Sequence, residues 1–466
     1  MATSVNPPRG MRDFLPAEKA RREHALGVIR SVYSAHGFDE IETPVVEDFE
    51  RLHSGLGGDN EKLAFSVLKR GLDATALAHA ADSGDQSGLT DLGLRFDLTV
   101  PLARFYATHR AELPPVFRSI QIAPVWRAER PQKGRYRQFV QCDIDIIGEA
   151  GPLAEVELIT ATAAALRTLG LSGTRVRIND RRVLLGLLES FGFAADEHAQ
   201  VLITIDKLDK IGAEGVVAEL RERSASPEAV EAFGAYLTAR VGDGVEDTIY
   251  PFGLESIQRK VPSDVAPEAL QSLADIGAAV QQADPAAVLV FDPFLVRGMG
   301  YYTGTIFEIE HPDFGYSLGG GGRYDGMIGR FLGQDVPAAG FSIGFERIVD
   351  LIEADASGAA DQVVLVHDAD AQPAQLALLK TALVAAGKRV RLERRTKNLK
   401  ATLDRVEAAG FGAFAFVGRD TSSIDQLEFK PLGCRSRWPA DRSAQAAQLN
   451  IHQQVDTHGC PHPPCR

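Results

Sequence analysis

Tryptophan, methionine and cysteine are scarce in this sequence of 466 residues, with two, four and four copies respectively. No apolar run approaches the ~20 residues that a membrane-spanning helix needs, and residues 1–12 lack the apolar core of a secretory signal. The spacing of the cysteines does not suggest a disulfide framework; they are Cys142, Cys434, Cys460 and Cys465. We therefore expect a protein of the cytoplasm.

An excess of basic residues is also missing. Lysine and arginine total 50 against 63 aspartate and glutamate residues, which gives a net charge of −13. A protein that is acidic overall contacts nucleic acid only through a local basic patch. The length and a hydrophobic content of 45% predict more than one core, with about two to four domains at roughly 100–200 residues each.

Hydrophobic periodicity divides the first third of the chain into alternating elements. Helical spacing predicts a helix over 17–36 that stops at Gly37. The run "GFDEIETPVV" is typical of a strand leading into Pro44. The soft, polar stretch 71–89 is interpreted as a loop or short insertion, and 94–148 as strand-rich.

The composition and hydrophobic spacing become typical of helices after residue 173. Residues 174–285 are rich in Ala, Leu, Glu and Lys and predict a helical insertion into a β-rich domain formed by 1–173 and 286–352. The small, polar residues 353–361 are typical of a linker. From 362 to 433 the chain alternates β-α-β-α-β, which predicts a separate small α/β domain.

The final residues, 434–466, have no periodicity, and we interpret them as a disordered or non-native tail. Four side chains there could chelate a metal: His458, Cys460, His462 and Cys465. Four ligands on a proline-rich end are a weak indication of a metal site. The sequence therefore assigns no metal ligands.

The strongest local signal is "VWRAERPQKGRYRQFVQCDIDIIG", residues 125–148. Because strand side chains alternate between faces, the second half places a polar set opposite an apolar set. The polar set is Phe139, Gln141, Asp143 and Asp145, and the apolar set is Val140, Cys142, Ile144 and Ile146. The preceding loop supplies Arg127, Arg130, Lys133 and Arg135, which suit phosphate, while Phe139 offers a face for a base. A nucleotide site is favoured, and a solvated basic hairpin remains the alternative.

Two later segments carry further candidate residues. Arg297 and the pair Tyr301–Tyr302 interrupt an apolar run, and Gly319–Gly322 follow it. Consecutive glycines indicate either close approach of a backbone or ligand or a flexible hairpin turn. The tyrosines order a polar substrate or pack in a core. In 338–352 a short strand precedes a helix, and Arg347 lies off its apolar stripe, where an exposed position is the simpler interpretation.

Five of these segments together resemble the histidyl-tRNA synthetases, a class II aminoacyl-tRNA synthetase family, over roughly residues 6–433. "GFDEIETPVV" is similar to motif 1, "RAERPQKGRYRQF" to motif 2 and "GFSIGFERI" to motif 3. "RFDLTVPLAR" (95–104) resembles the amino-acid-binding segment, and "LVRGMGYYTG" the histidine-specific segment. The resemblance implies an α+β fold: an antiparallel class II sheet flanked by helices, a helical insertion and a C-terminal anticodon-binding-like domain.

The resemblance also implies roles. Histidine would react with ATP to give histidyl-adenylate, with Mg²⁺ on the phosphates, before transfer to tRNA(His) by a homodimer. The catalytic residues implied are Arg127, Arg297 and Arg347. The ATP-binding residues implied are Arg127, Glu129, Arg135, Phe139 and Arg347. The histidine-binding residues implied are Asp97, Thr99, Gln141, Asp145, Arg297, Tyr301 and Tyr302.

The chain departs from the family's pattern at two positions. Gly300 stands where an acidic residue is usual, and Asp145 where many members have glutamate. The C-terminal domain is short, but it carries a basic cluster that suits an RNA backbone: Lys388, Arg389, Arg391, Arg394, Arg395, Lys397 and Lys400. A solvated helix face is the alternative for that cluster.

Two rival functions stay open from the sequence. One is a non-catalytic paralogue that serves as the regulatory subunit of ATP phosphoribosyltransferase. The other is an amino-acid ligase that hands the adenylate to an acceptor other than tRNA. Charging of tRNA separates the synthetase from both, and ATP–pyrophosphate exchange separates the two rivals from each other.

Overall fold

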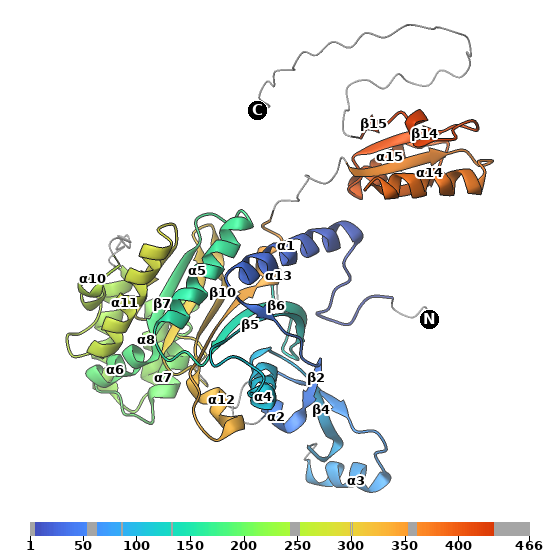
Figure 1. Ribbon diagram of the computed structural model, residues 1–466. Coiled ribbons are helices and arrows are strands. Elements are labelled where there is room, and N and C mark those ends of the chain that lie inside the picture. Colours follow the sequence, from blue (N-terminus) through green and yellow to red (C-terminus); the bar gives the residue numbers. More distant parts are fainter. Residues whose placement is uncertain are drawn as a thin grey trace. The chain divides into compact units, whose positions relative to one another are not determined.

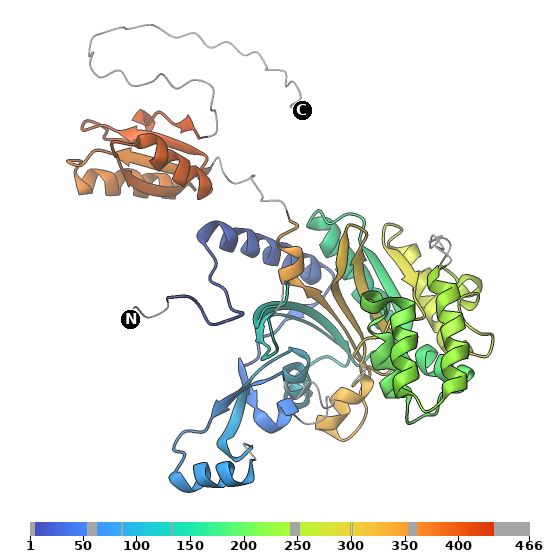
Figure 2. The same cartoon turned by 180° about the vertical axis from the view of Figure 1, so that it is seen from behind.

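The computed structural model describes residues 5–53, 63–84, 87–131, 134–242, 252–298, 300, 302–352 and 361–432. The chain forms two compact units, one up to residue 355 and one from residue 356, which Figures 1 and 2 show from opposite sides. Each unit is described by itself. Within the described residues, no helix has both the length and the apolar character that crossing a membrane requires.

The first unit is built on an eight-stranded sheet with the order β1-β5-β6-β11-β10-β9-β7-β8. Neighbouring strands are antiparallel except at the two edges, where β1 pairs with β5 and β7 with β8 in parallel. The strands are β1 (Asp39–Glu40), β5 (Phe117–Trp126), β6 (Gln138–Ile147), β7 (Arg175–Asp180), β8 (Val288–Phe291), β9 (Thr305–His311), β10 (Phe314–Arg323) and β11 (Ala338–Gly344). This mostly antiparallel sheet flanked by helices is the α+β architecture that the resemblance implied.

One face of the sheet is covered by α1 (Pro16–Ala35) and α5 (Leu153–Thr168). Ile29 and Tyr33 of α1 are fully buried in the same core as Cys142 and Ile144 of β6. A second core lies between α4 (Thr99–His109) and α12 (Asp325–Leu332). The short helix α13 (Phe345–Ile348) continues directly from β11. Because the apolar side chains of β6 face α1 and α5, its polar side chains point to the opposite face.

Two stretches expected to lack helices contain them. The supposed loop at 71–89 includes α3 (Ala74–Ser83), because the Asp73 side chain caps its first turn by accepting from the Ala76 N–H and Gly84 ends it in the left-handed conformation. The strand-rich stretch 94–148 includes α4. Asp97 accepts a hydrogen bond from the Val100 N–H at the start of α4 (3.3 Å).

The expected strand over 37–46 is much shorter in the structure. Only β1 pairs with the large sheet, and the chain then enters a separate three-stranded sheet. That small sheet has the order β2-β4-β3 and is accompanied by α2 and α3. Its elements are β2 (Val46–Asp48), α2 (Phe49–His53), β3 (Phe65–Leu68), the turn η2 (Ser87–Leu89) and β4 (Thr90–Leu94).

The stretch predicted as a helical insertion begins with a strand, since β7 pairs with β9 and β8. Helices then form a lobe beside that edge of the sheet, drawn in green in Figure 1. They are α6 (Arg181–Phe191), α7 (His198–Ile205), α8 (Leu208–Arg223), α9 (Pro227–Gly242), α10 (Leu254–Gln258) and α11 (Pro267–Ala283). The apolar stripe of α11 is buried, as its spacing predicts.

The second unit has the β-α-β-α-β order that the sequence pattern predicts. Its sheet has the order β13-β12-β14-β15, with β12 parallel to both neighbours. The elements are β12 (Gln362–His367), α14 (Pro373–Ala385), β13 (Arg389–Arg394), α15 (Leu399–Ala408), β14 (Ala413–Val417), the turn η4 (Ile424–Gln426) and β15 (Lys430–Pro431). The predicted tail, with its cysteines and histidines, lies outside the described residues, as does most of the predicted linker.

Candidate active site

A cavity of about 380 Å³ opens on the polar face of β6, β11 and β10 in the first unit. Almost every candidate residue from the sequence lines it: Asp97, Thr99, Arg127, Glu129, Arg135, Phe139, Gln141, Asp145, Arg297, Tyr302 and Arg347. Tyr301 lies outside the described residues, as does Lys133 of the basic loop. Side chains up to 250 positions apart in sequence, from Asp97 to Arg347, therefore meet at one site.

The strand β6 supplies the floor of the cavity. Phe139, Gln141 and Asp145 line it, whereas Cys142 and Ile144 are fully buried on the other face. The register aligns Gln141 with Gly344 and Asp145 with Gly340 on β11. The alternation of side chains along one strand therefore separates the site from the core.

The glycines of β10 make room for functional side chains. Gly319–Gly322 lie within the strand, paired to β11 on one side and β9 on the other, so they do not form a hairpin turn. A Cβ at Gly320 would lie 1.5 Å from Arg297 Nη1, and one at Gly321 would lie 2.0 Å from the Gly340 carbonyl oxygen. Close approach of a side chain and of a neighbouring backbone explains these glycines.

One end of the cavity is cationic. Arg127 donates from Nε to the Phe96 carbonyl (3.0 Å), and its guanidinium lies 4.9 Å from the centre of the Phe139 ring. Arg135 pairs with Glu129 (3.1 Å). This contact between two exposed groups ties the two halves of the loop together and is worth little in stability.

Arg297 and Arg347 extend the cationic end across the glycine-rich strand. Arg297 donates to the Gly319 carbonyl (3.2 Å) and pairs with Glu308 (3.4 Å). Arg347 donates to the Ser317 carbonyl and is half-buried rather than exposed. Burial, then the nearby charges of Arg135 and Arg297, lower the pKa of Arg347. Mutual repulsion among these guanidiniums indicates a place built for an anion.

The other end of the cavity is acidic. Burial raises the pKa of Asp97 to about 6 and the pKa of Asp145 to about 7. Burial, followed by the charge of Asp145, also raises the pKa of Asp143. The hydroxyl of Tyr324 donates to Asp145 Oδ1 (2.6 Å), and this hydrogen bond opposes the rise in the pKa of Asp145. Two buried carboxyls, Asp143 and Asp145, beside the half-buried Asp97 favour a cationic or hydrogen-bond-donating ligand.

Glu346 is a functional candidate that sequence reasoning missed. It accepts two hydrogen bonds from Arg22 of α1 (2.7 and 2.6 Å), one from the Val140 N–H (3.2 Å) and one from Arg12 (2.5 Å). It is 7% exposed and lines the cavity beside Arg347. Glu346 therefore joins β6, α1 and the start of the chain next to the arginines.

The N-terminal segment also supports the basic loop. The Arg12 guanidinium lies 3.6 Å from the centre of the Tyr136 ring. The Gly10 carbonyl accepts from the Arg137 N–H (2.8 Å), and Arg137 in turn donates to the Glu129 carbonyl (3.0 Å). A Cβ at Gly10 would lie 2.9 Å from Arg137 Cγ, and its φ of +84° favours glycine. These contacts hold the loop that carries Arg135.

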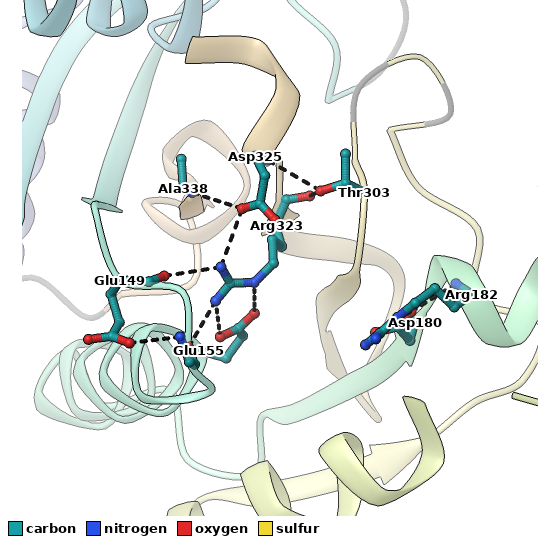
Figure 3. A network of polar contacts seen from close by, with 9 residues as sticks. Glu149, Glu155, Asp180, Arg182, Thr303, Arg323, Asp325 and Ala338 are labelled. Carbon is teal, nitrogen blue, oxygen red and sulfur yellow. Dashed lines mark hydrogen bonds and ion pairs between the residues drawn. The ribbon is translucent and has the colours of Figure 1, made fainter. Parts of the chain in front are cut away.

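Tyr324, also missed, lies in sequence between Arg323 and Asp325, two residues of the polar network in Figure 3. Arg323 pairs through two nitrogens with Glu155 (both 2.7 Å) and donates to the Glu149 and Gly151 carbonyls (3.1 and 3.0 Å). Asp325 accepts from Arg323 (3.3 Å) and from the Ala338 N–H (2.9 Å). The network fixes the end of β10 on both sides of Tyr324.

The second unit carries the predicted basic cluster on and beside β13, which is an edge strand. Arg389 and Arg391 lie over the Phe411 ring (4.9 and 4.6 Å), and Arg395 lies over Phe416 (5.4 Å). Lys388 pairs with Asp361 (2.8 Å). Three arginines of the cluster therefore lie over aromatic rings, while other members remain exposed.

The main cavity suits two ligands side by side, an amino acid and a nucleotide with its phosphates. An amino acid has an ammonium that fits the acidic end and a carboxylate that points toward the arginines. A nucleotide phosphate fits the cationic end. Among the described residues, no three His, Cys, Asp or Glu side chains are grouped so that they could hold a metal ion.

Comparison with known proteins points in the same direction. Residues 10–348 match the family model described as histidyl-tRNA synthetase. A protein from Leifsonia xyli subsp. xyli named histidine–tRNA ligase is 64% identical over 93% of this chain and 99% of its own length. The crystal structure of histidyl-tRNA synthetase from Nostoc sp. PCC 7120 aligns with a TM-score of 0.71 and 25% identity over 92% of this chain and 95% of that chain.

A structure described as an ATP phosphoribosyltransferase regulatory subunit/histidyl-tRNA synthetase, from Bacillus halodurans C, also aligns. Its TM-score is 0.67 at 20% identity, over 90% of this chain and 98% of that chain. Identity this low shows a common fold alone. The 64% identity to the Leifsonia protein favours a histidine–tRNA ligase over a regulatory subunit.

Proposed function

This chain belongs to the histidyl-tRNA synthetase family, and from that premise we propose that it is a histidine–tRNA ligase. It activates histidine with ATP to histidyl-adenylate and pyrophosphate, and then transfers the histidyl group to the 3′ end of tRNA(His). The observation that carries this proposal is the polarity of one cavity, which has Asp97 and Asp145 at one end and Arg297 and Arg347 at the other.

Histidine binds across this gradient of charge. Its α-ammonium is held by Asp97, Thr99 and Gln141, and its imidazole is read by Asp145 and Tyr302, and by Tyr301 as the family resemblance implies. Tyr324 fixes the Asp145 carboxyl that accepts from the ring. A competing amino acid without the ring nitrogens cannot make these hydrogen bonds, so the site discriminates against it by polarity as well as by shape.

ATP occupies the cationic end. Arg127 and Arg347 hold the phosphates, Arg135 reaches the distal ones, Phe139 supports the adenine and Glu129 contacts its amino group or the metal shell. Mg²⁺, when bound, neutralises the phosphates; it uses few protein carboxylates at nucleotide sites, and Glu129 is the candidate on this side. Arg127 lies over the Phe139 ring, which places a phosphate ligand beside the ring that supports the adenine.

The chemical step needs position and charge rather than a protein nucleophile. The histidine carboxylate oxygen attacks the α-phosphorus in line, a new P–O bond forms, and the bond to pyrophosphate breaks. Arg297 beside the glycine-rich strand neutralises charge that develops on the α-phosphate. The ribose hydroxyl of the terminal adenosine of tRNA then attacks the histidyl carbonyl, and AMP leaves.

The second unit supplies RNA affinity in this proposal. Its basic cluster on β13 contrasts with the net charge of the whole chain and suits the anticodon stem backbone. We further propose a homodimer in the cytoplasm, a helical domain over 174–285 inserted between motifs 2 and 3, and an anticodon-binding domain over 362–433. Gly300 stands where the family resemblance implies a carboxylate, and the Tyr302 ring packs closely against Gly298 and Gly322 of β10.

Histidine-dependent ATP–pyrophosphate exchange tests the proposal, with Arg297→Ala as the catalytic variant. We expect exchange with histidine alone and a loss of about 10²–10³-fold in the variant, the range seen when one charge-stabilising donor is removed. Folded protein that binds histidine without exchange would instead support the regulatory paralogue. Exchange without charging of tRNA would support a ligase with another acceptor.

A further inference from the structure

Asp143 is the buried carboxyl in the cavity to which neither the family resemblance nor the proposed roles give a task. It lies on β6 between Gln141 and Asp145, lines the cavity and is only 5% exposed. Its Oδ1 atom is buried and has no hydrogen-bond partner within the described residues. Burying an acceptor in this way costs free energy unless a ligand supplies the donor.

The side-chain amide of Gln141, two residues before Asp143, also has a buried acceptor that lacks a donor among the residues that the structure describes. Gln141 donates from Nε2 to Asp143 Oδ2 (3.2 Å), and its Oε1 atom is buried without a partner in the described part of the chain. Because a carboxylate oxygen accepts and does not donate, this contact requires the nitrogen end of the amide to face Asp143. The oxygen end of Gln141 is thereby left for the ligand.

We propose that Asp143 is a direct binding residue for the α-ammonium of the amino-acid substrate and also fixes the amide of Gln141 for the same contact. An ammonium has three donors and no acceptor. Asp143 Oδ1 and Gln141 Oε1 are two unsatisfied acceptors, and Asp97 and Thr99 share the third donor. This inference rests on the proposed function and deepens it by adding a residue that determines recognition of the amine.

The surroundings of Asp143 favour a cation over a neutral donor. Burial, then the charges of Asp145 and Asp97, raise the pKa of Asp143, while the charge of Arg127 lowers it. Ser342 on β11 also favours the ionised form. A neutral imidazole N–H would offset none of that repulsion, and the Asp145–Tyr324 pair already provides for the ring. A bound ammonium neutralises one carboxylate and satisfies two orphaned oxygens at once.

The experiment compares two ligands that differ only in the amine. Histidinol carries it, and 3-(imidazol-4-yl)propan-1-ol lacks it. Calorimetric titration of each into the full chain gives the gain in affinity that the amine provides. Asp143→Asn keeps the shape of the side chain, and Asp145→Asn, two residues along the same face of β6, is the matched control.

We expect Asp143→Asn to weaken histidinol binding by about 10- to 150-fold, the range for a hydrogen bond to a charged group, and to change binding of the deamino ligand by less than about threefold. Asp145→Asn should weaken both ligands. In pyrophosphate exchange, Asp143→Asn should raise the KM for histidine without changing the KM for ATP.

Equal loss for both ligands in Asp143→Asn, or no loss for histidinol, would overturn the inference. If that variant does not fold, as judged by circular dichroism, Asp143→Ser replaces it, because serine still accepts from Gln141 but carries no charge. Wild-type exchange with histidine separates this result from failure of the proposed function. Suppose that the wild type exchanges normally and that the Asp143 variants still bind histidinol more tightly than the deamino ligand by the wild-type factor. That result would refute this inference and leave the proposed function standing.

Discussion

A methyl group added at Gly340 should separate histidine binding from ATP binding. A Cβ at this position of β11 would lie 1.9 Å from Asp145 Oδ1 and 3.2 Å from Tyr324 Cε1. The nearest contacts are all side-chain atoms, so the strand can keep its register while the carboxyl moves. Gly340→Ala therefore breaks the 2.6 Å bond between Tyr324 and Asp145 without removing either side chain.

The size of the effect follows from the burial of that bond. Asp145 is 4% exposed, so water does not replace the lost contact. A hydrogen bond to a charged group is worth about 1.5–3 kcal/mol, which corresponds to about 10- to 150-fold in affinity. We expect the KM for histidine to rise by this factor in pyrophosphate exchange and the KM for ATP to stay within about threefold.

Two glycines of the same region provide controls. Gly326 in α12 has no atom within 4 Å of an added Cβ, so Gly326→Ala should leave both KM values unchanged. At Gly321 the Cβ would lie 2.0 Å from a main-chain oxygen, so Gly321→Ala should damage folding itself. The reasoning is refuted if Gly340→Ala leaves the KM for histidine unchanged, or raises both KM values together.

Three further outcomes are expected. Burial raises the pKa of Asp145 to about 7, so at this group the folded protein binds more protons than the unfolded chain between about pH 4 and pH 7. This group therefore lowers the free energy of unfolding as the pH rises through that window. Urea titrations at several pH values should show a smaller decrease of that free energy with pH in Asp145→Asn. Arg12→Ala removes an ion pair and a ring contact beside the ATP site; the KM for ATP should rise by about 2- to 10-fold, as expected for about 0.5–1.4 kcal/mol, with the exposed Arg9→Ala unaffected. Glu155→Ala leaves the buried Arg323 with Asp325 as its remaining ion-pair partner; a loss of about 3 kcal/mol in the free energy of unfolding in urea is expected, and a loss below about 1 kcal/mol would contradict it.

The elements that sequence could predict are those with a local cause. Alternation along β6 separates Gln141 and Asp145 from Cys142 because strand geometry has a period of two residues. The helix α11 follows from apolar spacing, and α14 from the alternation of strand and helix patterns after residue 362. By contrast, α3 lies in a stretch interpreted as a loop or short insertion, although Asp73 and Gly84 are ordinary capping signals at its two ends.

Parts of the site that depend on distant contacts could not be predicted. The pairs of Glu346 with Arg22 and Arg12 span 324 and 334 positions, and no local pattern marks either partner. Arg347 was expected to be exposed because its helix was considered alone. The glycines of β10 show the same limit, since sequence indicates that space is needed there but not that Arg297 fills it.

The span of the Glu346 contacts sets the order in which the protein can be assembled on the ribosome. Synthesis proceeds at about 5–20 residues per second, so Arg22 emerges roughly 16–65 seconds before the carboxylate that it binds, 324 positions later. During this interval α1 and the basic loop exist without their shared partner. The nucleotide end of the cavity is therefore completed among the last features of the first unit, and a nascent chain cannot engage ATP in its final geometry until translation has passed residue 346.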